Sequence, residues 1–230
     1  MNGPVTTYND PTKRPWAWSY SKLKNYETCP KRHFHYDISK DVKEPQSEEL
    51  KDGFYVHEML AKRVMNNEPL PERLQKYEPW AVKILTGEGK ILVEQKLAFR
   101  EDYSPCGYFE KGVWFRGVGD VIKIVGHAAL IVDWKTGKIV EDSQQLMLMA
   151  QCVFSHYPEV LGVRSEFVWL NHDATTRQNF KRDEMAQHWV GMLPRVAALK
   201  QAELTMTYPP KPGFLCRKWC AVKSCPHWGE

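Results

Sequence analysis

Apolar positions follow two different periods along the chain. From Glu48 to Asn66 they recur every three or four residues, which predicts an amphipathic helix. Three later segments, 90–99, 112–124 and 128–135, are instead rich in β-branched and aromatic residues. Such segments are typical of β-strands, so we expect three or more neighbouring antiparallel strands.

Other elements flank this strand region. Residues 1–18 are irregular and contain proline and tryptophan, so we expect an N-terminal arm there. Ser19 or Ser21 can cap a short helix that ends near Tyr26.

Helices and strands also alternate in the C-terminal half. Asp142 or Ser143 can begin a helix that runs to about residue 156, and 163–171 reads as a strand. A long helix is expected over 182–204, where the internal Pro194 should bend it. This order predicts an α/β fold with a central mixed sheet flanked by helices.

Two of the expected strands flank Gly126 and His127, a pair suited to a two-residue hairpin turn with glycine first. If these residues form the loop, each strand position pairs with the one equally far from the turn. Asp120 then lies directly opposite Asp133, with Cβ atoms roughly 5 Å apart. A loop longer by one residue would change this register.

Asp120 and Asp133 would then place two like charges face to face, which is unfavourable without a cation or a shared proton. A divalent metal ion meets that need. Lys135 falls on the same face of its strand as Asp133, because side chains alternate along a strand. Such a cluster suits phosphodiester hydrolysis, in which Mg²⁺ or Mn²⁺ polarises the phosphate and Lys135 helps to orient or deprotonate a water molecule. The alternative is an ordinary surface pair.

His57 belongs to the apolar face of the 48–66 helix, so we expect it to point inward. Alone, such a histidine is more often a core residue than a ligand. Beside the two carboxylates, however, a neutral imidazole is a natural further metal ligand. The face comprises Leu50, Phe54, His57, Ala61 and Val64.

Gln145 and Glu94 are further candidates for the same centre. Gln145 shares a helix face with Met149, so it can either project toward the carboxylates or remain solvated, and Met149 can belong to a packing surface. Glu94 fits either an active-centre acid or an exposed edge-strand position.

The tail from Tyr208 contains Cys216, Cys220 and Cys225 at short spacing. Closely spaced thiolates select an iron–sulfur cluster or zinc, and both want four ligands. Cys29, which precedes Pro30, is the best fourth ligand, and such a metal staple would join the N- and C-terminal segments. His227 is the alternative fourth ligand, in a local zinc site. Cys106 and Cys152 have no evident partner.

Composition limits the class of protein. The 230 residues are 43% hydrophobic and 12% aromatic, enough to bury one core, so we expect a single domain over 1–230 whose segment 208–230 packs against the region of Cys29. The net charge of +4 is compatible with a polyanionic partner but does not demand one. Neither a signal peptide nor an 18-residue apolar stretch occurs, which predicts a soluble protein of the cytoplasm without a membrane partner.

The ordered set of motifs resembles the RecB-like nucleases of the PD-(D/E)XK superfamily, most closely the CRISPR-associated and phage-encoded RecB-like exonucleases with an iron–sulfur cluster. The motifs are Cys29-Pro30, His57, Gly119-Asp120, Asp133-Trp134-Lys135, Gln145 and the terminal cysteines. The resemblance implies a restriction-endonuclease-like core. It also implies that His57, Asp120, Asp133 and the Trp134 carbonyl bind the metal and that Lys135 and Gln145 are catalytic. Cys29, Cys216, Cys220 and Cys225 would then hold a 4Fe-4S cluster, with structural Zn²⁺ as the alternative.

Met149 departs from the family pattern, which usually has a tyrosine four residues after the glutamine. The family resemblance further implies a DNA exonuclease that acts on single-stranded ends, often 5′ to 3′, in recombination, repair or phage DNA metabolism. Homo-oligomers or repair proteins would be its partners, and the host-cell cytoplasm would be its location if it is phage-encoded.

Two other functions remain open. A catalytically silent DNA-binding or adaptor protein would retain the fold without turnover. A structural zinc-binding interaction protein would bind metal at its tail and none at the hairpin.

Overall fold

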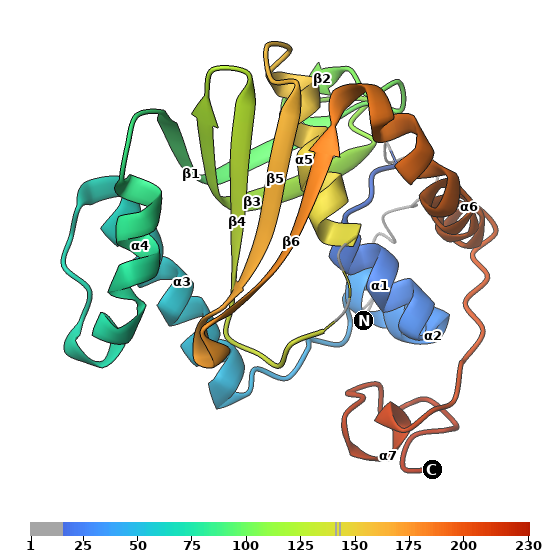
Figure 1. Ribbon diagram of the computed structural model, residues 1–230. Coiled ribbons are helices and arrows are strands. Elements are labelled where there is room, and N and C mark those ends of the chain that lie inside the picture. Colours follow the sequence, from blue (N-terminus) through green and yellow to red (C-terminus); the bar gives the residue numbers. More distant parts are fainter. Residues whose placement is uncertain (1–15, 141, 143) are drawn as a thin grey trace, which may run out of the picture. The chain divides into compact units, whose positions relative to one another are not determined.

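A computed structural model describes residues 16–140, 142 and 144–230 (Figure 1). These residues form two compact units. One consists of Gln46–Val190, and the other combines the described residues up to Pro45 with Gly191–Glu230. The division falls within helix α6 (Met185–Leu204). The expectation of a single domain stays a prediction.

The Gln46–Val190 unit is built on a six-stranded mixed sheet (Figure 1). Its strands lie in the order β2 (Pro105–Cys106), β1 (Lys90–Phe99), β3 (Phe115–Val125), β4 (Ala128–Lys135), β5 (Gly162–Trp169) and β6 (Ala174–Lys181). Neighbours are antiparallel except β4 and β5, which are parallel. Helix α5 (Gln144–His156) forms the crossover that a parallel pair requires. The expected α/β fold with a mixed sheet is confirmed, including three adjacent antiparallel strands.

The β3–β4 hairpin has the register that its turn predicts. Val125 pairs with Ala128, and the ladder continues to the pair of Val121 and Val132. Gly126 has a φ of 54°, a conformation that favours glycine. Beyond Val121 the ladder ends, and the next residue on β3 is Asp120.

Helices lie against the sheet. All residues of α5 from Leu146 to Phe154 are buried, as is typical of a helix packed against a sheet. Helices α3 (Glu48–Asn66) and α4 (Glu78–Leu85) join a hydrophobic cluster that includes Val121, Val132 and Trp134. A 3₁₀ segment, Glu72–Tyr77, leads into α4.

The prediction of which residues of α3 face the core is wrong in the N-terminal half of the helix. Its buried residues are Val56, Leu60 and Val64, whereas Leu50 and Phe54 have exposed fractions of 39% and 61%. The true core stripe is displaced by one residue, because the stripe that contains Phe54 and His57 lines an open cleft instead of the core.

Helix α4 and strand β6 of this unit are among the elements that the sequence did not predict. Helix α4 is short, and strand β6 has the polar sequence ATTRQNFK, of which Phe180 alone is buried. Strand β6 lies at the edge of the sheet, where polar side chains face water. Polarity at an edge weakens the hydrophobic pattern by which a strand is predicted.

The other unit contains α1 (Tyr20–Thr28), α2 (Pro30–His33), the π-helical turn Phe34–Ile38 and α7 (Leu215–Lys218). Ser19 caps α1, since its Oγ accepts a hydrogen bond from Lys22 N. Trp18 is 1% exposed, so the expected arm does not extend to it, because its large ring is buried. Residues 1–15 of that arm lie outside the described residues.

The C-terminal tail contacts the segment around Cys29 within this unit. Lys211 N donates a hydrogen bond to Cys29 Sγ at 3.4 Å, and Lys211 Nζ donates to the Glu27 carbonyl at 2.7 Å. Farther along, Ala221 N donates to the Tyr36 hydroxyl. Helix α6 contains Pro194, and the bend expected there stays a prediction. Among the helices of the described part of the chain, none combines the length and apolar character that a membrane crossing needs.

Candidate active site

Asp120 lies where strands β3 and β4 separate. Its Oδ2 accepts a hydrogen bond from the backbone N–H of Trp134 at 2.8 Å, so a side chain takes over from the backbone as acceptor at the end of the ladder. The indole of Trp134 is 1% exposed within the α3–α4 cluster and fixes this point of β4. The Asp120 carboxylate is therefore held between the two strands.

Asp133 and Lys135 on β4 meet the first turn of α5. Gln145 Nε2 donates a hydrogen bond to Asp133 Oδ1 at 2.6 Å, and Lys135 Nζ donates to Gln145 Oε1 at 3.2 Å. The Lys135 ammonium also lies 2.6 Å from Asp133 Oδ2 and 4.8 Å from the centre of the Phe167 ring. Gln145 thus bridges the acid and the base and fixes their relative position.

His57 on α3 reaches the same centre. Its Nδ1 lies 3.2 Å from Asp120 Oδ2, and its side chain is 30% exposed. Burial opposes the charged imidazolium, but the hydrogen bond and charge of Asp120 outweigh it and raise the pKa of His57. The structure therefore brings together the five side chains that the sequence suggested: His57, Asp120, Asp133, Lys135 and Gln145.

Burial raises the pKa of Asp133 to about 6, against the opposing charge of Lys135 and with a further contribution from Asp120. A carboxyl group that resists ionisation beside a second carboxyl group is a recurrent feature of functional sites. A cation bound between the two groups would favour their ionised forms, because it offsets the repulsion between the two negative charges.

Glu94 belongs to the same region. The β1–β3 ladder pairs Val93 with Val121 and Gln95 with Gly119, so the register places Glu94 opposite Asp120. Glu94 has a φ of 50°, and this irregularity turns its side chain toward the cleft. Burial and the charge of Asp120 raise its pKa. The active-centre alternative for Glu94 is thus the one that the geometry favours.

An open cleft gives access to these groups. Its wall is formed by side chains of α3, β1 and β3: Phe54, His57, Glu58, Ala61, Lys62, Met65, Glu94, Val118 and Asp120. The apolar pattern of α3 predicted that Phe54 is buried in the core. Its position one turn before His57, on the same face of the helix, indicates instead that it faces the cleft.

A sequence model of the PD-(D/E)XK nuclease superfamily matches residues 17–226. The chain belongs to this superfamily. The match spans both the carboxylate centre and the cysteine-rich tail. The comparison with curated proteins gives no significant match.

The solved structures that are similar to this PD-(D/E)XK chain include the following three. SSO0001 has a TM-score of 0.49 and 14% identity over 94% of this chain and 88% of its own. A candidate exonuclease from Eubacterium rectale has a TM-score of 0.46 and 15% identity over 88% of each chain. The alkaline exonuclease LHK-Exo from Laribacter hongkongensis has a TM-score of 0.36 and 12% identity over 85% of this chain and 93% of its own.

The donor atoms at the carboxylate centre fit a hard divalent cation in their chemistry. Carboxylate oxygens, a backbone carbonyl and an imidazole are ligands that Mg²⁺ and Mn²⁺ accept. Within residues 16–140, 142 and 144–230, however, no three His, Cys, Asp or Glu side chains converge as closely as a metal site requires. The metal ligands expected here, and those expected at the cysteines, therefore stay predictions.

Met149 is buried beneath β3 and does not line the cleft. Its side chain fills the space left by two glycines, since a Cβ at Gly117 would lie 2.7 Å from Met149 Sδ and one at Gly119 would lie 3.1 Å from Met149 Cε. The residue that departs from the family pattern thus serves packing between α5 and β3, which was the alternative left open for it.

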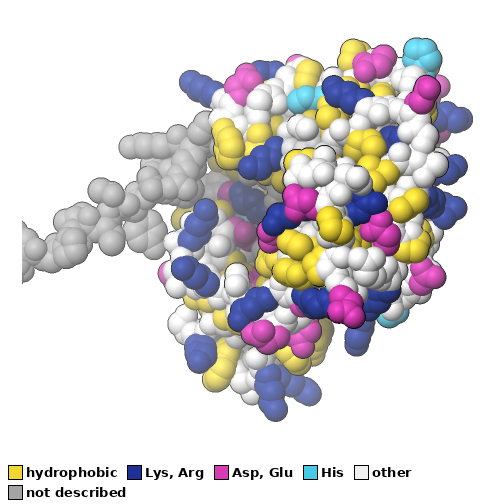
Figure 2. All heavy atoms as spheres, turned by 90° about the vertical axis from the view of Figure 1, so that its left-hand side faces the viewer, with side chains coloured by type: hydrophobic (Ala, Val, Ile, Leu, Met, Phe, Trp, Pro, Cys, Tyr) yellow, Lys and Arg dark blue, Asp and Glu magenta, His cyan; other side chains and the backbone are white. Residues whose placement is uncertain are grey.

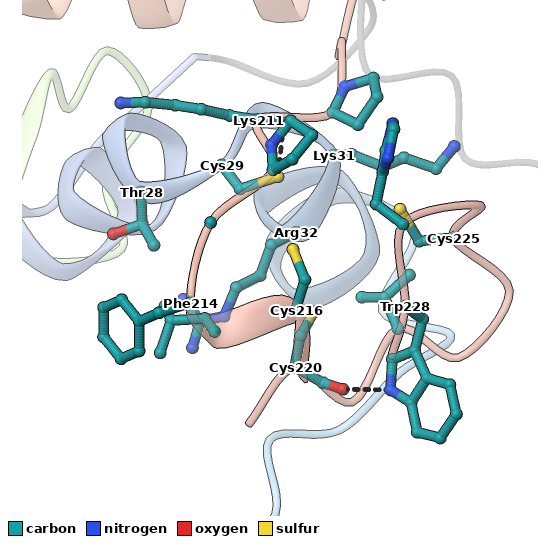
Figure 3. A pocket seen from close by; sticks show the side chains of 16 residues that line it. Thr28, Cys29, Lys31, Arg32, Lys211, Phe214, Cys216, Cys220, Cys225 and Trp228 are labelled. Atoms are coloured by element: carbon teal, nitrogen blue, oxygen red, sulfur yellow. Dashed lines mark hydrogen bonds between the residues drawn. The ribbon is translucent and has the colours of Figure 1, made fainter. Parts of the chain in front are cut away.

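The other unit of this superfamily member holds a cavity of about 180 Å³ lined by Cys29, Cys216, Cys220 and Cys225 (Figure 3). The backbone around these cysteines is hydrogen-bonded, with Trp228 Nε1 donating to the Cys220 carbonyl and Gly229 N to that of Cys216. The four thiols are thus neighbours, although they come from opposite ends of the chain. Cys106 and Cys152 lie in the sheet-containing unit and are buried.

Proposed function

We propose that this chain is a metal-dependent DNA exonuclease that acts on single-stranded ends. The observation that carries the proposal is the hydrogen-bonded group of Asp133, Lys135 and Gln145 beside the linked pair of Asp120 and His57. Membership in a nuclease superfamily gives this geometry its chemical context. The preference for single strands, the 5′-to-3′ direction and a role in recombination, repair or phage DNA metabolism are parts of the proposal.

In this proposal His57, Asp120, Asp133 and the Trp134 carbonyl hold Mg²⁺ or Mn²⁺. The bound ion would polarise the scissile phosphate and acidify a water molecule. Lys135 acts from the same side of β4 as Asp133: as an ammonium it orients that water, and as a neutral amine it deprotonates it, while Gln145 holds the Lys135 nitrogen in place. Glu94 adds a further carboxylate at the mouth of the centre.

We also propose that the four cysteines hold a 4Fe-4S cluster. Two features support this assignment: all four thiols line one cavity, and Lys31 and Lys211 line it too, so positive charge is available to balance the thiolates. A zinc site with His227 is the alternative. His227 also lines the cavity, but its Nδ1 lies 2.8 Å from the Glu230 carboxylate. Because this imidazole already has a partner, Cys29 is the preferred fourth ligand.

The first test is cleavage of single-stranded DNA labelled at either end, with anaerobically purified protein in Mg²⁺, in Mn²⁺ and in EDTA. Lys135→Ala should lower the rate by roughly 100-fold or more, because it removes the base of the group. Lys138→Ala is the matched control, since Lys138 is an exposed lysine three residues farther along. The label released first gives the direction of digestion.

One result would overturn the proposal. If the folded protein binds DNA yet leaves it uncut with each metal ion, the chain is a DNA-binding or adaptor protein with a nuclease fold. Equal cleavage by wild type and Lys135→Ala would instead remove Lys135 from the mechanism.

A further inference from the structure

Phe54 is unusually exposed for an aromatic residue in the middle of a helix. It keeps 61% of its surface accessible and lies one turn before His57 on the same face of α3. Across the cleft, Val118 is 36% exposed and lies two residues before Asp120 on β3. The cleft thus combines an apolar wall with the acidic centre.

The rest of the cleft wall strengthens this contrast. Ala61 and Met65 extend the apolar surface along α3, and Met65 is 58% exposed. Lys62, the lysine among the described residues of the lining, lies 2.8 Å from the Glu58 carboxylate and is compensated by it. This wall therefore offers little net positive charge to a phosphate backbone. On the face of the molecule shown in Figure 2, basic and acidic side chains likewise intermingle with hydrophobic ones.

A ligand of this cleft must satisfy both of its sides. A phosphodiester has to reach His57 and Asp120, while a planar apolar surface covers the ring of Phe54. An unpaired nucleotide provides both, since its base has an open π-face on which an aromatic side chain stacks. In a duplex the bases stack on one another, and that face is covered.

We propose that Phe54 is a stacking platform for the base of an unpaired nucleotide next to the scissile phosphate. The inference rests on the proposed nuclease function and deepens it, since it gives a physical cause for selecting single strands. Phe54 is here a substrate-positioning residue that acts by contact with the base, whereas the acids and Lys135 act on the phosphate.

The test compares Phe54→Ala, Phe54→Tyr and Leu50→Ala on two single-stranded DNAs, one intact and one with abasic residues at both ends. Phe54→Ala should raise KM for intact DNA roughly tenfold and change kcat less, because stacking on one base is lost. Phe54→Tyr should restore KM. Leu50→Ala is the matched control, since Leu50 is an exposed apolar residue of α3 that does not line the cleft.

The abasic DNA makes the test specific to stacking. Wild type should bind the abasic DNA as weakly as Phe54→Ala binds intact DNA. Phe54→Ala should bind abasic and intact DNA with the same affinity. An equal loss by Phe54→Ala on both DNAs, or an equal effect of Leu50→Ala, would overturn the inference and leave the nuclease assignment intact. If wild type cleaves no DNA, the same comparison of affinities in EDTA, by fluorescence anisotropy, still decides whether Phe54 stacks on a base.

Discussion

His33, on α2, is a buried titratable side chain outside the candidate active site. Its ring has no exposed surface, with Nδ1 3.0 Å from Asp37 Oδ2 and Nε2 3.3 Å from Glu203 Oε1. Lys22 Nζ reaches the same Glu203 oxygen at 2.8 Å. The ring of Tyr208 lies tilted at 54° to that of His33, with 6.0 Å between the ring centres, and burial raises the pKa of Tyr208 to about 12, so it stays neutral at ordinary pH.

The direction of the pKa shifts predicts how this cluster stabilises the fold. Burial opposes protonation of His33, but Asp37 and Glu203 outweigh it and raise the pKa of the imidazole. The stabilisation by protonated His33 is complete below the ordinary histidine pKa of about 6.5 and is lost as pH rises through the folded value. Burial works against the charged form of Glu203 too, yet His33 and Lys22 lower its pKa, so its contribution is lost only at acid pH.

His33→Gln should therefore destabilise the protein more at pH 5.5 than at pH 8.5. The loss at the lower pH should be about 2 kcal/mol, the value of hydrogen bonds to charged groups. Urea unfolding of wild type and variant at both pH values measures it. His172→Gln, at an exposed histidine, is the control. A loss that is independent of pH would mean that the imidazole acts by packing alone.

At the scale of elements, α5 and β3 fit together through Met149 and the glycines at 117 and 119. Met149→Tyr, which restores the residue usual in the family, should destabilise the protein by about 1–3 kcal/mol, because a ring overfills a space shaped for a thioether. Met149→Leu keeps the volume and should cost less than about 1.5 kcal/mol. Thermal unfolding of both variants measures the difference.

A stable Met149→Tyr protein with higher nuclease activity would contradict that packing argument. It would show that the ring turns toward the cleft and serves the chemistry there.

The elements also show what the sequence could and could not predict. The turn at Gly126 determined the β3–β4 register, so local chemistry was sufficient to place Asp120 and Asp133 directly after the last ladder pair, Val121 and Val132. The apolar pattern of α3 predicts the wrong buried face, because a stripe that lines a cleft has the same periodicity as one that lines a core. Glu94 remained ambiguous, since its positive φ is a property of the folded strand that its sequence does not reveal.

At the scale of the whole molecule, residues far apart in sequence meet in both units. His57, Glu94, Asp120, Asp133 and Gln145 converge in one unit, each from a different helix or strand. Cys29 and the three tail cysteines meet in the other. A ligand held by these four thiols would close a loop of nearly the whole chain, and its binding energy would add to the free energy of unfolding.

The proposed cluster predicts that anaerobically purified protein is coloured and contains about four iron and four sulfide ions per chain. Cys29→Ser should lose most of this iron and lower the melting temperature, because one of the four ligands is removed. Cys106→Ser is the matched control, since this buried cysteine lies in the sheet-containing unit and should keep the iron. Zinc in place of iron, lost on His227→Ala, would favour the local zinc site. If folded wild-type protein contains neither iron nor zinc, the staple is ruled out. Lys135-dependent cleavage would still stand in that case, because it depends on the acidic centre alone.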